Sequence, residues 1–102
     1  MTRRAQIEAM LAADPHDGFL RYALSMEMAS AGDPAGALAE LQKLLADDPA
    51  YLAAYFQAAQ LAAQLGQMEE AKKLLDLGVP RAQAAGDLHA AEEMQGLRAS
   101  LG

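Results

Sequence analysis

The 102-residue sequence contains very few of the residues that favour β-strands. Thr2, Ile7 and Val79 are its only β-branched residues, and it has no tryptophan. Strands draw mainly on branched and aromatic side chains, so this composition excludes a protein built on a sheet. Alanine and leucine, which are strong helix formers, supply 41 of the 102 residues. The sequence therefore predicts an all-α protein, and its length predicts a single domain.

Cysteine is absent and basic residues are scarce. The absence of cysteine excludes disulfides, thiolate catalysis and cysteine zinc sites. Eight Lys and Arg residues against fourteen Asp and Glu residues give a net charge of −6, which repels phosphate backbones and anionic lipids. The basic residues are scattered and form no stripe. We therefore expect neither nucleic acid nor a membrane surface as a partner.

Long hydrophobic runs are also missing. No window approaches the ~18 apolar residues that a membrane span requires. Arg3 and Arg4 would suit the start of a signal peptide, but Glu8 falls where its apolar segment should run. These patterns predict a soluble, cytoplasmic protein.

The sequence repeats itself at an offset of 34 residues. Residues 11–15 (Leu-Ala-Ala-Asp-Pro) fall on residues 45–49 (Leu-Ala-Asp-Asp-Pro). The same offset places Gly32 on Gly66, Ala37 on Ala71 and Leu41 on Leu75. Internal repetition at this period is typical of arrays built from helical hairpins.

Turn and capping residues divide each repeat into two helices. Asp14-Pro15 and Asp48-Pro49 each combine an N-cap residue with a proline suited to the first helical turn, and Asp33-Pro34 does the same. Gly32 and Gly66 suit the left-handed residue that ends a helix. The predicted helices lie near residues 2–13, 15–31, 34–46, 49–65, 68–85 and 87–100.

Three features modify this simple plan. Gly78-Val79-Pro80 interrupts the fifth predicted helix, where we expect a kink or a restart. The first helix places Ile7, Met10 and Leu11 in register with Leu41, Leu44 and Leu45, as in the second helix of an incomplete preceding unit. The pattern of the last helix predicts a solvated capping helix with one apolar stripe, formed by Leu88, Ala91, Met94, Leu97 and Leu101.

The spacing and the small residues resemble the tetratricopeptide repeat. The family pattern falls on Arg21, Leu24, Ser25, Met28, Ala37, Leu41 and Pro49, and again on Tyr55, Ala58, Ala59, Ala62, Ala71 and Leu75. Arg21 stands in the tryptophan position of the first unit, and Gln83 stands where the second should close with proline. The resemblance implies helical hairpin repeats, as in short stand-alone bacterial proteins of the family. The division that we predict is a half-repeat helix at 2–13, repeats at 14–47 and 48–82, and a capping helix at 83–102.

No combination of residues predicts catalysis, a cofactor or a metal site. His89 lies three and four residues before Glu92 and Glu93, but no third metal ligand is indicated. The paired acids such as Glu69-Glu70 suit helix starts and solvated faces rather than a desolvated cleft. Ser25 has no evident base partner and stands where small size matters. We expect a protein that is not an enzyme.

The resemblance implies a concave groove lined by the first helix of each unit. The groove residues that it predicts are Phe19, Tyr22, Met26, Ser30, Ala53, Phe56, Gln60 and Gln64. Chaperone-binding members hold a C-terminal carboxylate with Lys, Arg and Asn at positions where this sequence has residues such as Tyr22, Met26 and Gln57, which argues against that clamp.

The apolar groove predicts a protein interaction module that binds a peptide or helix of a partner. The alternative is a homodimer that buries the same face. A third alternative is that the flanking helices cover the apolar groove residues.

Overall fold

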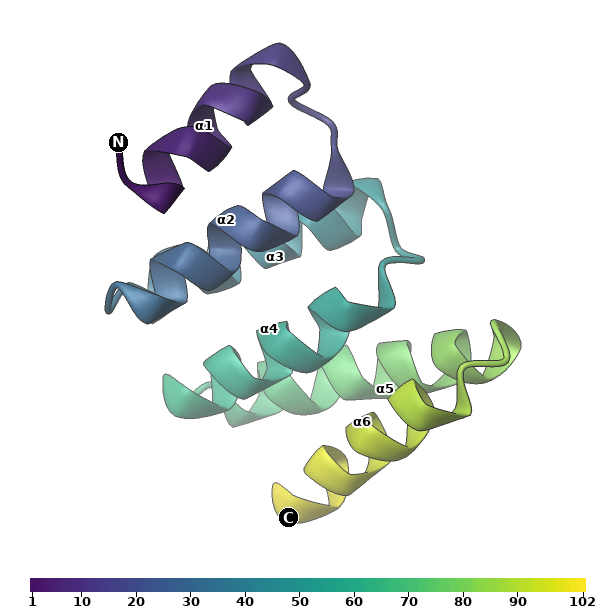
Figure 1. Cartoon of the computed structure of the whole chain (residues 1–102). Coiled ribbons are helices and arrows are strands. Elements are labelled where there is room, and N and C mark those ends of the chain that lie inside the picture. Colours follow the sequence, from purple (N-terminus) through teal and green to yellow (C-terminus); the bar gives the residue numbers. More distant parts are fainter.

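The computed structural model describes residues 1–102 as six helices with no strand (Figure 1). The helices are α1 (Arg3–Ala13), α2 (Gly18–Ser30), α3 (Pro34–Asp47), α4 (Leu52–Gln64), α5 (Met68–Ala84) and α6 (Leu88–Ser100). The all-α prediction is confirmed, and each helix lies within three residues of its predicted bounds. None of the six is long and apolar enough to cross a membrane.

The predicted starts of α2 and α4 are wrong because the Asp-Pro pairs end helices instead of opening them. The amide of Asp14 donates to the Met10 carbonyl oxygen, and this bond ends α1. In the same way the amide of Asp48 donates to the Leu44 carbonyl oxygen at 2.7 Å, and this bond ends α3. A proline directly after the last helical turn stops it. Helix α2 begins at Gly18, three residues after its predicted start at Pro15. Its N-cap is Asp17, whose carboxylate accepts from the Leu20 amide at 2.9 Å.

The turns inside the two hairpins follow the glycine prediction. Gly32 and Gly66 have φ values of 88° and 79°, a left-handed conformation that glycine adopts without a steric penalty. Beside Gly32, the Asp33 amide donates to the Met28 carbonyl oxygen at 2.9 Å and the Asp33 carboxylate accepts from the Gly36 amide, also at 2.9 Å. Asp33 therefore helps to end α2 and also caps α3.

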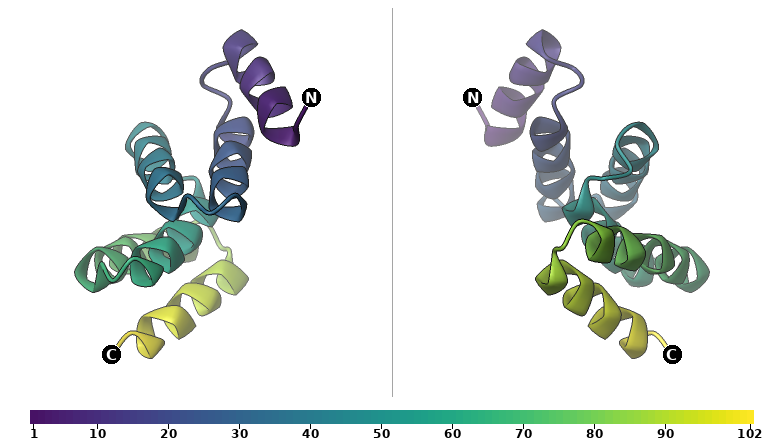
Figure 2. Two further views of the ribbon diagram at one scale, coloured as in Figure 1. Left: turned by 90° about the vertical axis from the view of Figure 1, so that its left-hand side faces the viewer. Right: turned by 90° about the vertical axis from the view of Figure 1, so that its right-hand side faces the viewer.

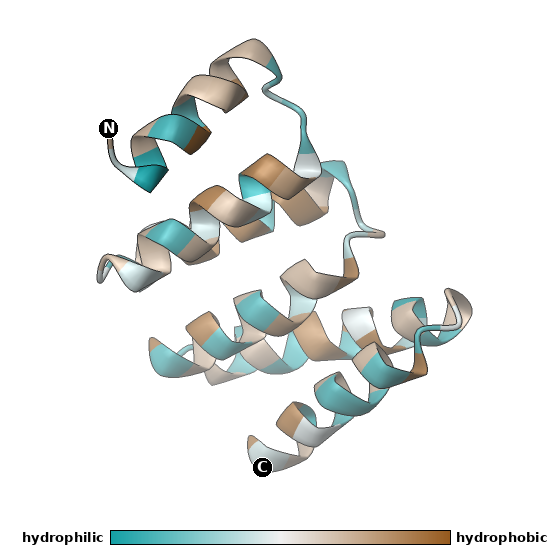
Figure 3. Ribbon diagram, viewed as in Figure 1, coloured by the Kyte–Doolittle hydropathy of each residue, from teal (hydrophilic) through white to brown (hydrophobic).

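The helices form two packed hairpins with one helix added at each end. Helix α2 packs on α3, α4 packs on α5, α6 packs on α5 and α4, and α1 packs against α2. Helices α3 and α5 lie behind α2 and α4 in Figure 1, and both views in Figure 2 place them on the same side of the molecule. Hydrophobic colours in Figure 3 gather on α2, α3 and α4, whereas the connecting loops are mostly hydrophilic.

Small side chains lie where the helices approach most closely. Ala37 and Ala71 are fully buried, as are Ala58, Ala59 and Ala62 of α4. Leucines fill the space between these contacts, so that Leu41, Leu44 and Leu75 are almost completely inaccessible to solvent. The 34-residue register, which placed Ala37 and Ala71 at equivalent contacts, agrees with this core.

Of the two outcomes predicted at Gly78-Val79-Pro80, a kink or a restart, the restart does not occur in α5. It runs for 17 residues with Pro80 on its exposed side, where the missing amide costs one hydrogen bond. Gly78 is buried, and a Cβ atom there would lie 2.6 Å from the sulfur of Met94 and 2.8 Å from the Cβ of Tyr55. The glycine thus permits close contact among α4, α5 and α6, and this packing accompanies the unbroken helix.

The end helices match their predicted stripes only in part. Ile7 is buried, but Met10 is 57% exposed whereas Leu44, its counterpart in α3, is 1% exposed. Helix α1 packs mainly against α2, so one side of it is uncovered. In α6, Ala91 and Met94 are buried, but Leu88, the first residue of the helix, is 67% exposed.

Candidate functional site: the inner face of α2, α4 and α6

None of the eight predicted groove residues belongs to the buried core. Phe19 is 70% exposed, and Tyr22, Met26 and Phe56 are half-buried. The remaining four are small or polar residues that are exposed: Ser30, Ala53, Gln60 and Gln64. All eight come from α2 or α4, and we call the surface that these helices form with α6 the inner face.

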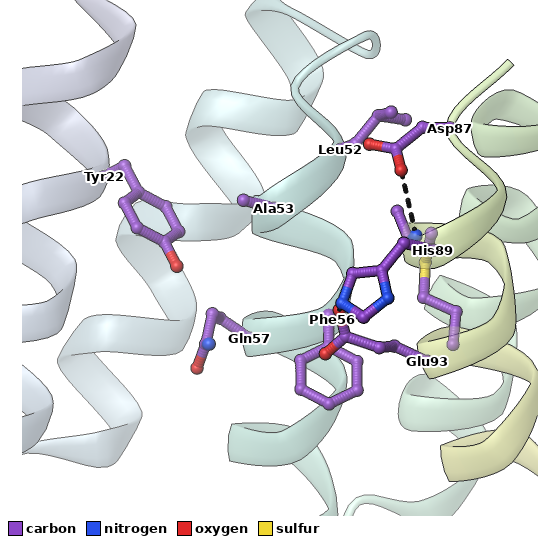
Figure 4. A pocket seen from close by; sticks show the side chains of 10 residues that line it. Tyr22, Leu52, Ala53, Phe56, Gln57, Asp87, His89 and Glu93 are labelled. Atoms are coloured by element: carbon purple, nitrogen blue, oxygen red, sulfur yellow. Dashed lines mark hydrogen bonds and ion pairs between the residues drawn. The ribbon is translucent and has the colours of Figure 1, made fainter. Parts of the chain in front are cut away.

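A pocket of about 260 Å³ lies on the inner face, between α4 and α6. It brings together three of the predicted residues, Tyr22, Ala53 and Phe56, while the other five lie outside its lining. Figure 4 shows Tyr22 on one side and the α6 residues on the other, with Ala53 and Gln57 of α4 between them. The full lining is Tyr22, Leu52, Ala53, Phe56, Gln57, Asp87, His89, Ala90, Glu93 and Met94.

The α6 side of the pocket was not predicted from the sequence. Helix α4 begins 34 residues after α2, but α6 begins 36 residues after α4, at Leu88. An offset of 34 residues therefore pairs the residues of α6 with the wrong positions of α4, and it does not identify which α6 residues line the inner face. The signal that could have revealed the shift is Gln83, since without the closing proline α5 extends to Ala84, 17 residues against 14 in α3.

The apolar wall of the pocket is anchored to the core. Tyr22 and Phe56 both pack against buried residues, and the Tyr22 ring lies 5.6 Å from that of Tyr51, centroid to centroid, at 31°. Burial raises the pKa of Tyr22 above its ordinary value of 10.0, although the Gln57 side chain opposes this shift. The phenol is therefore neutral at physiological pH.

The polar rim comes from α6 and carries no lysine or arginine. The carboxylate of Asp87 accepts from the Ala90 amide at 3.0 Å and caps α6, the bond that Figure 4 marks with a dashed line. The Nε2 atom of His89 lies 2.8 Å from a carboxylate oxygen of Glu93, one turn further along. The inner pocket thus combines an apolar wall with a rim of acidic and imidazole groups.

Comparison with known proteins identifies the class to which this architecture belongs. A tetratricopeptide repeat family model matches residues 28–101, nearly three quarters of the chain. The matched region runs through α6. The chain therefore belongs to the tetratricopeptide repeat family, as the sequence resemblance implied.

Solved structures agree with this assignment. The solution structure of a tetratricopeptide repeat domain protein from Salinibacter ruber is 28% identical with a TM-score of 0.81, covering 85% of this chain and 88% of that one. A crystal structure of such a protein from Salinibacter ruber is 27% identical with a TM-score of 0.79, covering 83% and 94%. The solution structure of a protein from Bordetella parapertussis is 27% identical with a TM-score of 0.84, covering 99% and 88%. No curated protein matches the sequence.

Proposed function

We propose that the chain binds a peptide or helix of another protein on its inner face. Tetratricopeptide repeat domains generally mediate protein–protein interactions, so the family supports binding as the class of activity. The observation that carries the proposal is the apolar wall of Tyr22 and Phe56, which borders a pocket open to solvent. Phe19 and Met26 extend the apolar surface along α2.

The size of the pocket favours an anchoring side chain over a small-molecule ligand. Ligand pockets typically measure about 300–1,000 Å³ and bury most of their ligand. The inner pocket, at about 260 Å³, is below that range and open on one side. One apolar side chain of a partner segment fits such a space, and interface anchors typically fill well-packed pockets of this kind.

We propose binding without catalysis. The titratable groups of the rim already have partners or face solvent: Asp87 caps a helix, and His89 and Glu93 pair with each other on an exposed surface. General acid or base catalysis works best with a group whose pKa is tuned by a desolvated site. The tetratricopeptide repeat family is generally non-enzymatic, which points the same way.

The substitution Ala53→Arg tests the proposal with little disturbance of the core. Ala53 is exposed, is the second residue of α4 and lines the pocket, so an arginine there fills the pocket and removes no buried contact. Ala35→Arg is a matched control, because Ala35 is exposed and is the second residue of α3, outside the pocket. Each immobilised variant is used to capture proteins from the cells that make the chain.

We expect the parent and Ala35→Arg to retain the same partner, and Ala53→Arg to reduce its recovery at least about tenfold, the effect of losing one good interface anchor. Circular dichroism melting checks that all three proteins are folded. Equal recovery of the partner by Ala53→Arg would place its binding site elsewhere.

A further inference from the structure

A second concave surface lies between α3 and α5, the two helices behind α2 and α4 in Figure 1. It has a volume of about 370 Å³. Its apolar floor includes Leu45, Leu74 and Leu77, and its cations are Lys73 and Arg81. We call these five residues the outer notch. It shares no lining residue with the inner pocket.

The outer notch contains the only two Lys and Arg side chains that form no ion pair. Six of the eight Lys and Arg residues lie within 4.0 Å of a carboxylate, in the pairs Arg3–Glu27, Arg4–Glu8, Arg21–Asp47, Lys43–Glu40, Lys72–Glu69 and Arg98–Asp76. Lys73 and Arg81 have no such partner, although the chain carries fourteen acidic residues. Both unpaired cations therefore fall in one small region of an acidic molecule.

The two cations and a leucine lie in line along α5. Lys73, Leu77 and Arg81 are spaced four residues apart, so they share one side of the helix and span about 12 Å. Leu77 is 50% exposed between the two charges. Glu70 is the one acidic residue that lines the notch, and its carboxylate accepts from the Gln42 side chain of α3 at 3.3 Å. The apolar centre thus has a positive charge on each side.

We propose that the outer notch docks an acidic amphipathic segment of a partner protein. An apolar side chain of the segment packs on Leu77 and the leucines of the floor, and two carboxylates of the segment pair with Lys73 and Arg81. The charge of the notch is opposite in sign to that of the whole molecule, which carries −6. An acidic segment is therefore repelled by most of the surface and attracted at the notch, and this complementarity selects the site. The proposal does not depend on the inner face.

A defined peptide tests the proposal by fluorescence anisotropy. The acidic peptide is a short helix with two glutamates two turns apart and leucines between them, and the basic peptide has lysines in place of the glutamates. We expect the parent chain to bind the acidic peptide saturably and at least about tenfold more tightly than the basic one. Ala53→Arg should bind the acidic peptide as the parent does, which separates this site from the inner pocket.

Two variants of equal net charge then locate the site. The first double variant carries Lys73→Glu and Arg81→Glu and should bind the acidic peptide at least about tenfold more weakly than the parent. The second carries Arg3→Glu and Arg4→Glu and should weaken that binding much less. The basic peptide should bind the first variant more tightly than the second, because only the first creates an acidic notch.

Equal affinity of the two variants for the acidic peptide would overturn the proposal, and so would a parent chain that does not distinguish the two peptides. Loss of binding in Ala53→Arg would also overturn it, by assigning the peptide to the inner face. Melting curves confirm that each variant is folded.

Discussion

At the scale of single residues, the close contact among α4, α5 and α6 depends on Gly78. A methyl group there would overlap Met94 and Tyr55, so we expect Gly78→Ala to cost about 1–3 kcal/mol of unfolding free energy. Gly96→Ala is the control, because a methyl group there meets nothing within 4 Å, and it should stabilise α6 by about 0.5–1 kcal/mol. Urea unfolding measures both changes. If the two variants shifted stability in the same direction, the contact at Gly78 would not be as close as described.

The tyrosines make stability depend on alkaline pH. Burial is the largest cause that raises the pKa of Tyr22, Tyr51 and Tyr55 above the ordinary value of 10.0, and at Tyr55 the nearby Arg81 opposes it. Below pH 10 the phenols are neutral in both the folded and the unfolded chain, so their contribution is fully present. Above pH 10 the unfolded chain ionises first and is favoured. The free energy of unfolding should therefore fall as pH rises from about 10 through the folded-state values.

Absorbance of the phenolate measures this titration in the native protein, and urea unfolding from pH 7 to about pH 11 measures its effect on stability. Tyr55→Phe should make the alkaline loss smaller. At neutral pH it should cost about 1 kcal/mol, because the Tyr55 hydroxyl donates to the Pro49 carbonyl oxygen at 2.6 Å. Native tyrosines that all ionised at the ordinary pKa would contradict the assigned burial.

At the scale of helices, the repeat register can be tested through its alanines. Ala37 and Ala71 are fully buried where paired helices touch, so replacement of either with leucine should overpack the contact and cost about 1–3 kcal/mol. Ala35 is exposed on α3 and should accept leucine almost freely. Chemical denaturation compares the three variants. Equal tolerance at all three positions would show that the 34-residue register does not describe the packing.

The helices were predictable because their signals are local and agree with one another. Helix-forming composition, the left-handed glycines and the cap at Asp33 all favour the same elements. The errors arise where one motif has two meanings. Asp-Pro can open a helix or follow the end of one, and at Asp14 and Asp48 only the position of the preceding helix decides.

Tertiary contacts explain the features that local signals missed. Pro80 predicted a kink or a restart in α5, but the helix continues without a restart. The close contact at Gly78 accompanies this continuity, and no local rule contains that contact. The five pocket residues at the start of α6 were missed for a similar reason, since the longer α5 shifts α6 by two residues relative to the repeat spacing. Tyr22, Ala53 and Phe56 were predicted because α2 and α4 keep the repeat spacing, whereas Leu52 and Gln57 of α4 were not among the predicted groove residues.

At the scale of the whole molecule, the stacking of hairpins produces two faces of different character. The inner pocket has an aromatic wall and a rim without Lys or Arg, whereas the outer notch has a leucine floor and two unpaired cations. Each hairpin buries its small and aliphatic residues against its neighbours, so the side chains left over define the two surfaces. The two proposed sites share no lining residue, so a partner at one would not occupy the other.

The central claim is that the inner face is open for a partner and is not buried between identical copies. Sedimentation equilibrium over a hundredfold range of concentration tests it most directly, with the parent and Ala53→Arg compared in parallel. We predict the mass of a single chain for both proteins at every concentration. A parent that forms dimers, together with an Ala53→Arg variant that stays monomeric and folded, would contradict the claim and assign the inner face to self-association.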